Sequence, residues 1–403
     1  MAVRDPNGRR HTFHVEHTSM ENKGMIRVHM FPVGVGDFLW VRFGKDDTLE
    51  HNILIDGGEE RFCGLYKLVL QSIADKEQTA MIIMTHIDSD HIQAAAQALS
   101  ELPANLLNRV IDKIYFNTGS SIRKAQSSLI MAGMTDKNPE EDIFVRNVSF
   151  THSVKDGEKF MSMLERKGID DKLTEMMVYP MKTDYKGACL QFISPGFKEV
   201  NTLLNKWQKY KLDHGISTHA VIKPSDTNLD DLKNTRLGYD TSITNKSSFA
   251  FIFEYQGKKG AFLGDASASV ICAGLQSAGI TKPYPVDFVK ISHHGSMRNV
   301  SDKLLKALPT HNYLISTQGK PDSNVPSKIT IAHMLKINGP LTIYNNYPWW
   351  AGNGAYHNNF FTAEDQISYI NTGKLTLIEL NEHPVKVDVD IELCGLITAW
   401  GER

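Results

Sequence analysis

The order of elements predicted for this 403-residue chain indicates an α/β domain built in layers. Three observations support this fold class. Short apolar runs alternate with stretches of helical periodicity, and several predicted strands are joined by glycine-containing turns. In addition, clusters of His and Asp come directly after apolar runs. The two halves of the chain look alike in this respect, and no solenoid repeat is found.

The first part of the chain predicts an antiparallel start to a sheet. Residues 1–24 are polar and His-rich and lack the apolar core of a signal peptide, so we predict a tail there. Glycine turns then separate three short apolar runs, and a helix and a buried strand come next. The elements expected here are strands over residues 25–31, 38–43 and 52–55, a helix over 65–73, a strand over 80–84 and a helix over 92–99.

The middle of the chain is less regular and ends in a polar segment. Its expected elements are a strand over residues 113–117, a helix over 156–166, a strand over 190–193 and a helix over 197–210. Residues 212–247 are rich in Asp, Asn, Thr, Lys and Ser and have little apolar periodicity. We therefore predict a long polar surface loop or insertion.

Regular patterning returns in the second half, where a turn at Gly257–Gly260 predicts a hairpin. The expected elements are strands over residues 249–255 and 261–263, a helix over 266–278, a strand over 286–291, a helix over 302–308, a strand over 313–316, a helix over 327–337 and a strand over 341–344. We place the main domain at residues 25–345.

Residues 346–403 are aromatic at first and then β-rich, and we expect them to pack on the main domain as a C-terminal extension. Their aromatic residues are candidates for a protein contact, but such clusters are more often core packing. The cluster consists of Tyr347, Trp349, Trp350, Tyr356, Phe360 and Phe361.

The composition is that of an ordinary soluble globular protein, with 41% hydrophobic and 22% charged residues. The net charge of -2 does not indicate that the whole protein binds nucleic acid, although a local basic groove is compatible with this net charge. No apolar run reaches membrane-spanning length, and we expect a cytoplasmic protein. Widely spaced cysteines are expected to be buried free thiols: Cys63, Cys189, Cys272 and Cys394.

One segment, His86-Ile87-Asp88-Ser89-Asp90-His91, carries the strongest signal of function. It holds four side chains that can bind a metal, and it comes soon after the apolar run Ala80–Met84. A loop that closes so tightly directs imidazoles and carboxylates to one point, as in sites for one or two divalent cations. The alternative interpretation is a polar turn with a capping Asp.

Two further polar loops come after apolar runs in the second half of the chain, Gly264-Asp265 and His293-His294. A lone Asp after a strand is usually a cap or turn residue, and a lone His pair is usually structural. In combination with the His86–His91 loop, and in this order, both become candidate metal ligands.

The three loops together resemble the metallo-β-lactamase superfold, and the resemblance covers residues 25–344. It implies an αββα sandwich, in which two mixed β-sheets with outer helices hold metals at their strand ends. Further motifs are similar to those of one branch, the hydrolase domain of ComEC/Rec2-type bacterial DNA-uptake channels and its stand-alone soluble relatives. These motifs are Val33–Asp37, Ile53–Gly58, His86–His91, Asn245 with Ser248, Leu263–Ala266 and Lys290–Ser296. Without an accompanying membrane channel, the chain resembles a stand-alone relative.

This resemblance implies a dinuclear metal centre. His86 and Asp88 would bind one ion, and Asp90 and His91 would bind the second. Asp265 would bridge the two ions.

One residue of the pair His293-His294 would complete the second site. Neighbouring residues on an extended loop point in opposite directions, so the two are not expected to bind the same ion. We predict His294 as the ligand and His293 as a proton donor or phosphate contact, with the exchanged assignment left open. Asp90 would also orient the nucleophile.

The predicted ligand set departs from the wider superfold in two ways. Asp88 stands where a histidine is common, and this oxygen donor favours Mn²⁺ or Fe²⁺ relative to a His-rich zinc site, with Zn²⁺ still possible. The histidine usually found between the first loop and the bridging Asp has no clear counterpart. His152 and His214 come after no convincing strand, and Ser194–Gly196 occupies that strand end. The first ion is therefore expected to be held loosely or partly by substrate.

These features predict a metal-dependent hydrolase with two divalent ions, in first place a phosphodiesterase or nuclease that uses a metal-bridging hydroxide. One alternative is a hydrolase of small esters, lactones or phosphorylcholine-type substrates on the same centre. Another is a non-catalytic regulatory or defence-system component that retains the fold, which the nearly complete ligand set disfavours.

Lys290, Lys246 and Ser296 are candidate substrate contacts, with solvated surface charge or a turn as the alternative role. The expected partner is nucleic acid or another phosphodiester, and no membrane partner is expected. A protein partner from an operon-encoded system is compatible with the sequence, which does not indicate the oligomeric state.

Overall fold

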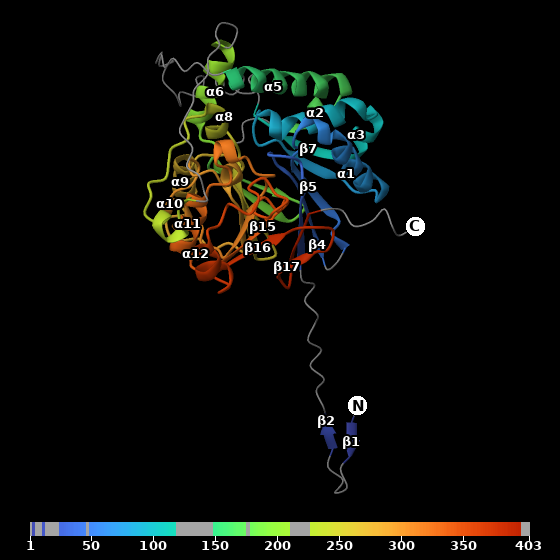
Figure 1. Cartoon of the computed structure of the whole chain (residues 1–403). Helices are drawn as coiled ribbons and strands as arrows, with labels where there is room; N and C mark the ends of the chain where they lie inside the picture. Colours follow the sequence, from blue (N-terminus) through green and yellow to red (C-terminus); the bar gives the residue numbers. More distant parts are fainter. Residues whose placement is uncertain are drawn as a thin grey trace.

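Two eight-stranded mixed sheets pack face to face and carry helices on their outer faces (Figure 1). This is the predicted αββα sandwich, and the fold class is confirmed. The computed structural model describes residues 2–4, 10–12, 24–45, 48–117, 148–174, 178–209 and 226–395. Two short strands at the start of the chain, β1 (Ala2–Arg4) and β2 (Arg10–Thr12), form a separate antiparallel pair.

The first sheet has the strand order β17-β18-β3-β4-β5-β6-β7-β8. The bounds are β3 (Gly24–Met30), β4 (Phe38–Lys45), β5 (His51–Asp56), β6 (Ala80–Ile83), β7 (Ile111–Tyr115), β8 (Leu173–Thr174), β17 (Val385–Asp388) and β18 (Ile391–Cys394). Strands β3, β4 and β5 are antiparallel neighbours, as the glycine turns predicted. From β5 to β8 all pairings are parallel.

The second sheet has the order β16-β15-β14-β13-β12-β11-β10-β9. The bounds are β9 (Met181–Tyr185), β10 (Ala188–Ser194), β11 (Ala250–Tyr255), β12 (Lys258–Phe262), β13 (Phe288–Lys290), β14 (Asn312–Ile315), β15 (Leu341–Asn345) and β16 (Leu375–Glu379). The predicted hairpin joins β11 and β12 in antiparallel pairing. Parallel pairing continues from β12 to β16.

The helices fall into two groups, one on the outer face of each sheet (Figure 1). The first group comprises α1 (Cys63–Asp75), α2 (Ser89–Glu101), α3 (Ala104–Val110) and α5 (Val148–Lys167), and the second comprises α9 (Ala268–Ser277), α10 (Asp302–Ala307) and α11 (Lys328–Asn338). Further helices are α6 (Phe197–Lys209), α7 (Leu229–Leu232), α8 (Ile243–Lys246) and α12 (Ala363–Asp365). Apolar side chains of the first group pack on Trp40, Leu54 and Ile82, and those of the second group pack on Ile252, Val289 and Ile343.

A third apolar cluster lies between the two sheets and holds them together. It is rich in aromatic residues, and the rings of Phe43 from β4 and Phe253 from β11 meet edge to face with centroids 5.3 Å apart. Because this core is continuous across both sheets, it fixes how the strand ends of one sheet lie against those of the other.

The carboxyl ends of β5, β6, β12 and β13 meet at one edge of the sandwich. Strands β5 and β6 are parallel, and so are β12 and β13, so each pair ends on the same side of its sheet. The backbone NH of Phe249, just before β11, donates to the carbonyl of Thr85, just after β6, at 2.9 Å. This hydrogen bond joins the two sheets where the polar loops begin.

The C-terminal residues predicted as an extension contribute strands to both sheets. Strand β16 pairs with β15, and β18 pairs in parallel with β3. The aromatic cluster packs in the core, as predicted for Trp349, Tyr356, Phe360 and Phe361, which are buried. The boundary between a main domain and an extension stays a prediction.

The segment predicted as a polar surface loop or insertion, residues 212–247, is mostly irregular and exposed or half-buried where the structure describes it, but it also contains two short helices. Residues 210–225 lie outside the described residues. From residue 226 onward the chain forms α7 and α8, and Leu229 and Leu232 are buried in the helix-side core of the second sheet. The backbone NH of Leu229 donates to the buried carboxylate of Asp365 at 2.7 Å. Long-range contacts hold this polar segment in place, and such contacts leave no periodic pattern in the sequence from which they could be predicted.

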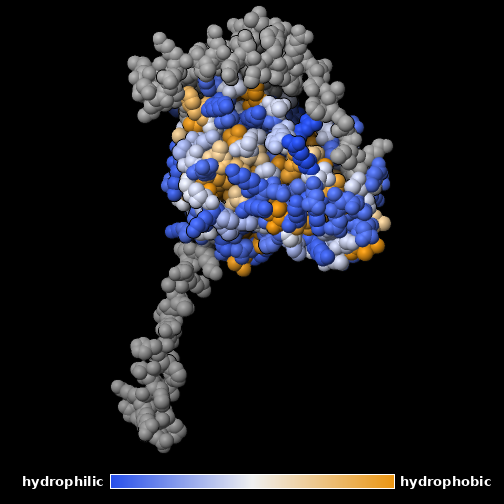
Figure 2. Space-filling model, turned by 90° about the vertical axis from the view of Figure 1, so that its left-hand side faces the viewer, coloured by the Kyte–Doolittle hydropathy of each residue, from blue (hydrophilic) through white to orange (hydrophobic). Residues whose placement is uncertain are grey.

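Hydrophilic residues cover most of the face shown in Figure 2, with hydrophobic residues interspersed. Within the described part of the chain, no helix combines the length and apolarity needed to cross a bilayer.

All four cysteines are free, as predicted, but only Cys272 and Cys394 are buried, whereas Cys63 and Cys189 are half-buried.

We expect Phe253→Ala to lower the free energy of unfolding by about 3–5 kcal/mol, because it opens a cavity between the sheets. Ile367→Ala is the matched control, since that side chain is 61% exposed, and its effect should stay within about 0.5 kcal/mol. Urea denaturation followed by circular dichroism measures both changes. Equal effects of the two substitutions would contradict the position of this core.

Candidate metal centre

The carboxylate of Asp56, at the end of β5, orients two histidines of the first sheet. It is fully buried, and its Oδ1 accepts the backbone NH of Thr85 at 2.7 Å. Its Oδ2 accepts the Thr85 hydroxyl at 2.7 Å and Nδ1–H of His91 at 2.8 Å. Because the Thr85 hydroxyl donates to Asp56, its oxygen is left to accept Nδ1–H of His86 at 2.9 Å. In its neutral form each imidazole therefore keeps its lone pair on Nε2.

Glycine residues after Asp56 let this loop lie against the start of α2. The backbone NH groups of Gly57 and Gly58 donate to the carbonyl of His91 at 2.7 and 3.3 Å. A Cβ atom on Gly57 would lie 2.7 Å from the backbone nitrogen of Ala95, so a larger residue would push the loop and the helix apart. The close approach keeps Asp56 beneath His91.

The loop that carries His293 and His294 is not extended, so the geometric premise for separating the two residues was wrong. Both residues have left-handed backbone angles, with φ of 48° and 54°, within the short turn η5 (Ser292–Gly295). As a result both imidazoles face the same carboxylate. His294 donates its Nδ1–H to the carbonyl of Ser316 at 2.8 Å, and His293 donates its Nδ1–H to Oδ1 of Asn299 at 2.9 Å.

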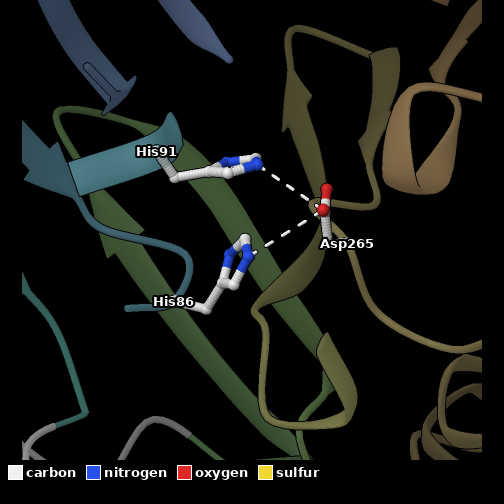
Figure 3. A group of neighbouring side chains, drawn as sticks. All are labelled: His86, His91 and Asp265. Atoms are coloured by element: carbon white, nitrogen blue, oxygen red, sulfur yellow. Dashed lines mark ion pairs between the residues drawn. The ribbon is translucent and has the colours of Figure 1, made fainter. Parts of the chain in front are cut away.

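Four imidazoles surround the carboxylate of Asp265, which lies just after β12 in the second sheet. Figure 3 shows two of them, His86 and His91, reaching across from the first sheet. The distances from Oδ2 of Asp265 to Nε2 are 3.9 Å for His86, 3.5 Å for His91, 3.7 Å for His293 and 3.7 Å for His294. The sequence-predicted loops thus converge on one oxygen, although they are far apart along the chain.

Buried atoms at this point have no hydrogen-bond partner among the described residues. They are Nε2 of His86, His91 and His294 and Oδ1 of Asp265. Leaving such atoms unpaired is costly, and divalent cations bound between them would satisfy them, because neutral imidazoles and a carboxylate each offer a lone pair. The donor set therefore fits a metal ion.

Asp88 and Asp90 lie on the open side of the cluster and are about a quarter and a third exposed. Oδ2 of Asp88 lies 3.6 Å from Nε2 of His86 and accepts the Thr244 hydroxyl at 3.1 Å. Oδ2 of Asp90 lies 3.8 Å from Nε2 of His294. These carboxylates add oxygen donors where solvent reaches the cluster.

Several groups of three side chains have their ligand atoms within 4.8 Å of one another in the described part of the chain. They are His86, His91 and Asp265; Asp90, His91 and His294; Asp37, Asp265 and His294; and Asp37, Asp56 and His91. Five of the six predicted ligands occur in these groups. Asp88 and His293 occur in none of them.

The electrostatics of the cluster reflect the surplus of imidazoles around one carboxylate. Burial alone would raise the pKa of Asp265, but the neighbouring His91, His293 and His294 hold it well below its usual range. Burial would likewise lower the pKa of His293, but the carboxylates of Asp265 and Asp240 raise it to about 9. Without a cation, the histidines and Asp265 therefore balance one another's charge.

Asp37 and Asp56 belong to motifs noted in the sequence, but their roles were not predicted. The ammonium of Lys290 forms an ion pair with Asp37, and both side chains are about 1% exposed. Burial would raise the pKa of Asp37, but Lys290 and His294 lower it strongly. The prediction that Lys290 contacts substrate is therefore wrong, because its charge is buried and paired beneath the centre.

The other predicted substrate contacts have different positions. Ser296 is buried, and its hydroxyl accepts the backbone NH of Arg298 at 3.3 Å, which is the turn role. Lys246 is half-buried at the end of α8. Two histidines were considered for the ligand that is usual between the first loop and the bridging Asp. His152 lies in α5, and His214 lies outside the described residues. Ser194, at the strand end in this interval, donates to the carbonyl of Ser248 at 2.9 Å.

Several solved structures match this chain over most of its length at low identity and low TM-score. The Zn²⁺-bound PqqB from Methylobacterium extorquens is 11% identical with a TM-score of 0.34, and the match covers 86% of this chain and 85% of that chain. A diphosphatase from the PhnP family is 10% identical, with a TM-score of 0.33 and coverage of 93% and 96%. The short form of human tRNase Z is 11% identical, with a TM-score of 0.32 and coverage of 90% and 99%.

At these identities and TM-scores, the matches give no information on the metal or the substrate of this chain. No family model matches the chain. A comparison with curated proteins gives no match either.

We expect Asp56→Asn to weaken metal binding by about 10- to 100-fold without unfolding the protein. The amide that replaces Oδ1 or Oδ2 cannot accept all three hydrogen bonds, so His91 or His86 loses its orientation. Titration of the metal-free protein with Mn²⁺ or Zn²⁺ against a chelating dye measures the affinity. The control is Asp75→Asn on the exposed end of α1, and an unchanged affinity in Asp56→Asn would contradict the orienting role.

Proposed function

We propose that this chain is a metal-dependent hydrolase that cleaves phosphodiester bonds with two divalent ions bound around Asp265. The observation that best supports this proposal is the convergence of four imidazole Nε2 atoms on one carboxylate oxygen. Each imidazole has its Nδ1 engaged by a neighbour, which leaves Nε2 as the free donor. A structural His–Asp pair would need only one such imidazole.

In this proposal His86 and Asp88 hold one ion, and Asp90, His91 and His294 hold the other, with Asp265 shared between them. The three carboxylates make the ligand set rich in oxygen, which suits Mn²⁺ or Fe²⁺ as well as Zn²⁺. When bound, two such ions lower the pKa of a water ligand and neutralise charge that develops on the substrate.

The residues of the chain itself would orient and bind. Asp90 combines partial exposure with a position 3.8 Å from Nε2 of His294, so its carboxylate can also accept a proton from a water molecule at the open side. Gly36 lies directly behind it, because a Cβ atom at Gly36 would be 1.6 Å from the carbonyl oxygen of Asp90. The backbone of Asp90 is thus held in place by a contact that admits no side chain.

The choice of phosphodiesters rests on the oxygen-rich ligand set and on the motifs that resemble those of the ComEC/Rec2-type hydrolase branch. Two cationic residues come close to the site residues in the chain. Arg298 is exposed and comes three residues after the turn η5, and the half-buried Lys246 directly follows Asn245, which contacts His293. They replace Lys290 as candidate contacts for a phosphate. Nucleic acid is the proposed substrate class, and a cytoplasmic location remains part of the proposal.

A substrate screen tests the proposed reaction. Protein loaded with Mn²⁺ or Zn²⁺ is incubated with single- and double-stranded DNA, RNA and bis(p-nitrophenyl) phosphate, and we expect cleavage of at least one phosphodiester. Simple esters, lactones and p-nitrophenylphosphorylcholine are tested in parallel. Turnover only of these would replace the proposal with the small-substrate hydrolase, and turnover of none would favour a non-catalytic role.

We expect Asp265→Ala and Asp90→Ala each to reduce phosphodiester turnover by at least about 100-fold, because each removes a carboxylate from the metal centre. Bound metal should fall in both variants, as measured by elemental analysis, while circular dichroism stays unchanged. The control is Asp75→Ala on α1. Full metal content in Asp265→Ala would refute the shared-ligand assignment.

A further inference from the structure

We propose that His293 is a metal ligand, and that the consecutive residues His293 and His294 bind different ions. His293 would join His86 and Asp88 at the first ion, and His294 would join Asp90 and His91 at the second. This inference rests on the proposed dinuclear centre and replaces the proton-donor role predicted for His293. It also gives the first ion a second imidazole, which the sequence did not provide.

The backbone of the turn allows two adjacent imidazoles to reach one carboxylate from different directions. Left-handed angles at both residues place each Nε2 3.7 Å from Oδ2 of Asp265. The two rings are nevertheless 5.7 Å apart between centroids and inclined by 75°. Two ligands of one small ion seldom come from consecutive residues, whereas two ions that share Asp265 need donors on both sides of it.

Contacts around each ring place the two residues on different sides of the cluster. Nε2 of His294 lies near Oδ2 of Asp90, and the ring of His294 lies 5.3 Å from that of His91. On the other side, the short helix α8 contacts both His293 and Asp88. The Thr244 hydroxyl donates to Asp88 at 3.1 Å, and the amide nitrogen of the adjacent Asn245 lies 3.2 Å from Nδ1 of His293.

Asn299 fixes the tautomer that makes His293 a ligand. It is fully buried, and its amide group donates to Oδ2 of Asp240 at 2.7 Å and to the backbone carbonyl of Asp265 at 2.9 Å. With both N–H bonds used, only its Oδ1 can face His293, so Nδ1 of His293 must carry a proton. The lone pair of the neutral ring then lies on Nε2, facing Asp265.

The same arrangement is found at the other three imidazoles. His86, His91 and His294 donate Nδ1–H to Thr85, Asp56 and the carbonyl of Ser316 respectively. Held in this way, the neutral form of each ring presents its Nε2 lone pair toward Asp265, as a metal ligand requires. His293 therefore has the same hydrogen-bond pattern as the three predicted histidine ligands.

Metal stoichiometry of defined variants tests this inference. Metal-free protein is saturated with Mn²⁺, passed through a desalting column and analysed for metal per chain, with circular dichroism as the check on folding. We expect two ions in the unaltered protein and in His383→Ala, a control whose side chain is 80% exposed. His293→Ala and His294→Ala should each retain one ion.

Double variants identify which ion each histidine holds. If His293 and Asp88 share an ion, Asp88→Ala with His293→Ala still retains the other ion, whereas Asp90→Ala with His293→Ala loses both. Two ions in His293→Ala, or the reverse pattern in the double variants, would overturn the inference. Because stoichiometry is measured without substrate, two ions in a protein that cleaves no phosphodiester would contradict the proposed reaction and leave the ligand assignment standing.

Discussion

The hydrogen bonds to Nδ1 of four histidines are the constraint on which the rest of the site depends. An acceptor at Nδ1 favours the tautomer of the neutral imidazole that has its lone pair on Nε2, and it fixes the orientation of the ring. A carboxylate, a hydroxyl, an amide oxygen and a backbone carbonyl serve this purpose at His91, His86, His293 and His294. These acceptors come from both sheets, so the aromatic core between the sheets also determines whether the four donors meet at Asp265.

The centre is supported from below by charges that solvent does not reach. Lys290 and Asp37 join the two sheets beneath His294 as a buried ion pair. Such a pair contributes little to the free energy of unfolding when compared with apolar residues of similar size. Removing one partner, however, leaves an unpaired buried charge and lowers the free energy of unfolding by about 3–5 kcal/mol. The pair also places a fixed positive charge near a cluster of carboxylates, which limits the repulsion among Asp37, Asp56 and Asp265.

The sequence was sufficient to predict the layered fold and the three loops at the site, because an apolar run with His or Asp directly after it marks both the end of a strand and a polar loop. It could not show that Asp56 orients His91, since the acceptor and the ring are thirty-five positions apart. Asn245 belongs to a motif noted in the sequence, but its contact with His293 and the role of Asp240 were not predicted, because both residues reach that ring through tertiary contacts and have no periodic pattern. Lys290 appeared accessible in the sequence only because its buried partner, Asp37, precedes it by more than two hundred residues.

The central claim is that Asp265 lies between two divalent ions, each with imidazole ligands from both sheets or their loops. Crystals of the protein grown with Mn²⁺ or Zn²⁺, with diffraction data recorded on either side of the metal absorption edge, test it most directly. We expect two anomalous peaks, both within bonding distance of the Asp265 carboxylate. One peak should also lie within bonding distance of His86 and His293, and the other within bonding distance of His91 and His294. A single peak, or two peaks that do not contact Asp265, would contradict it.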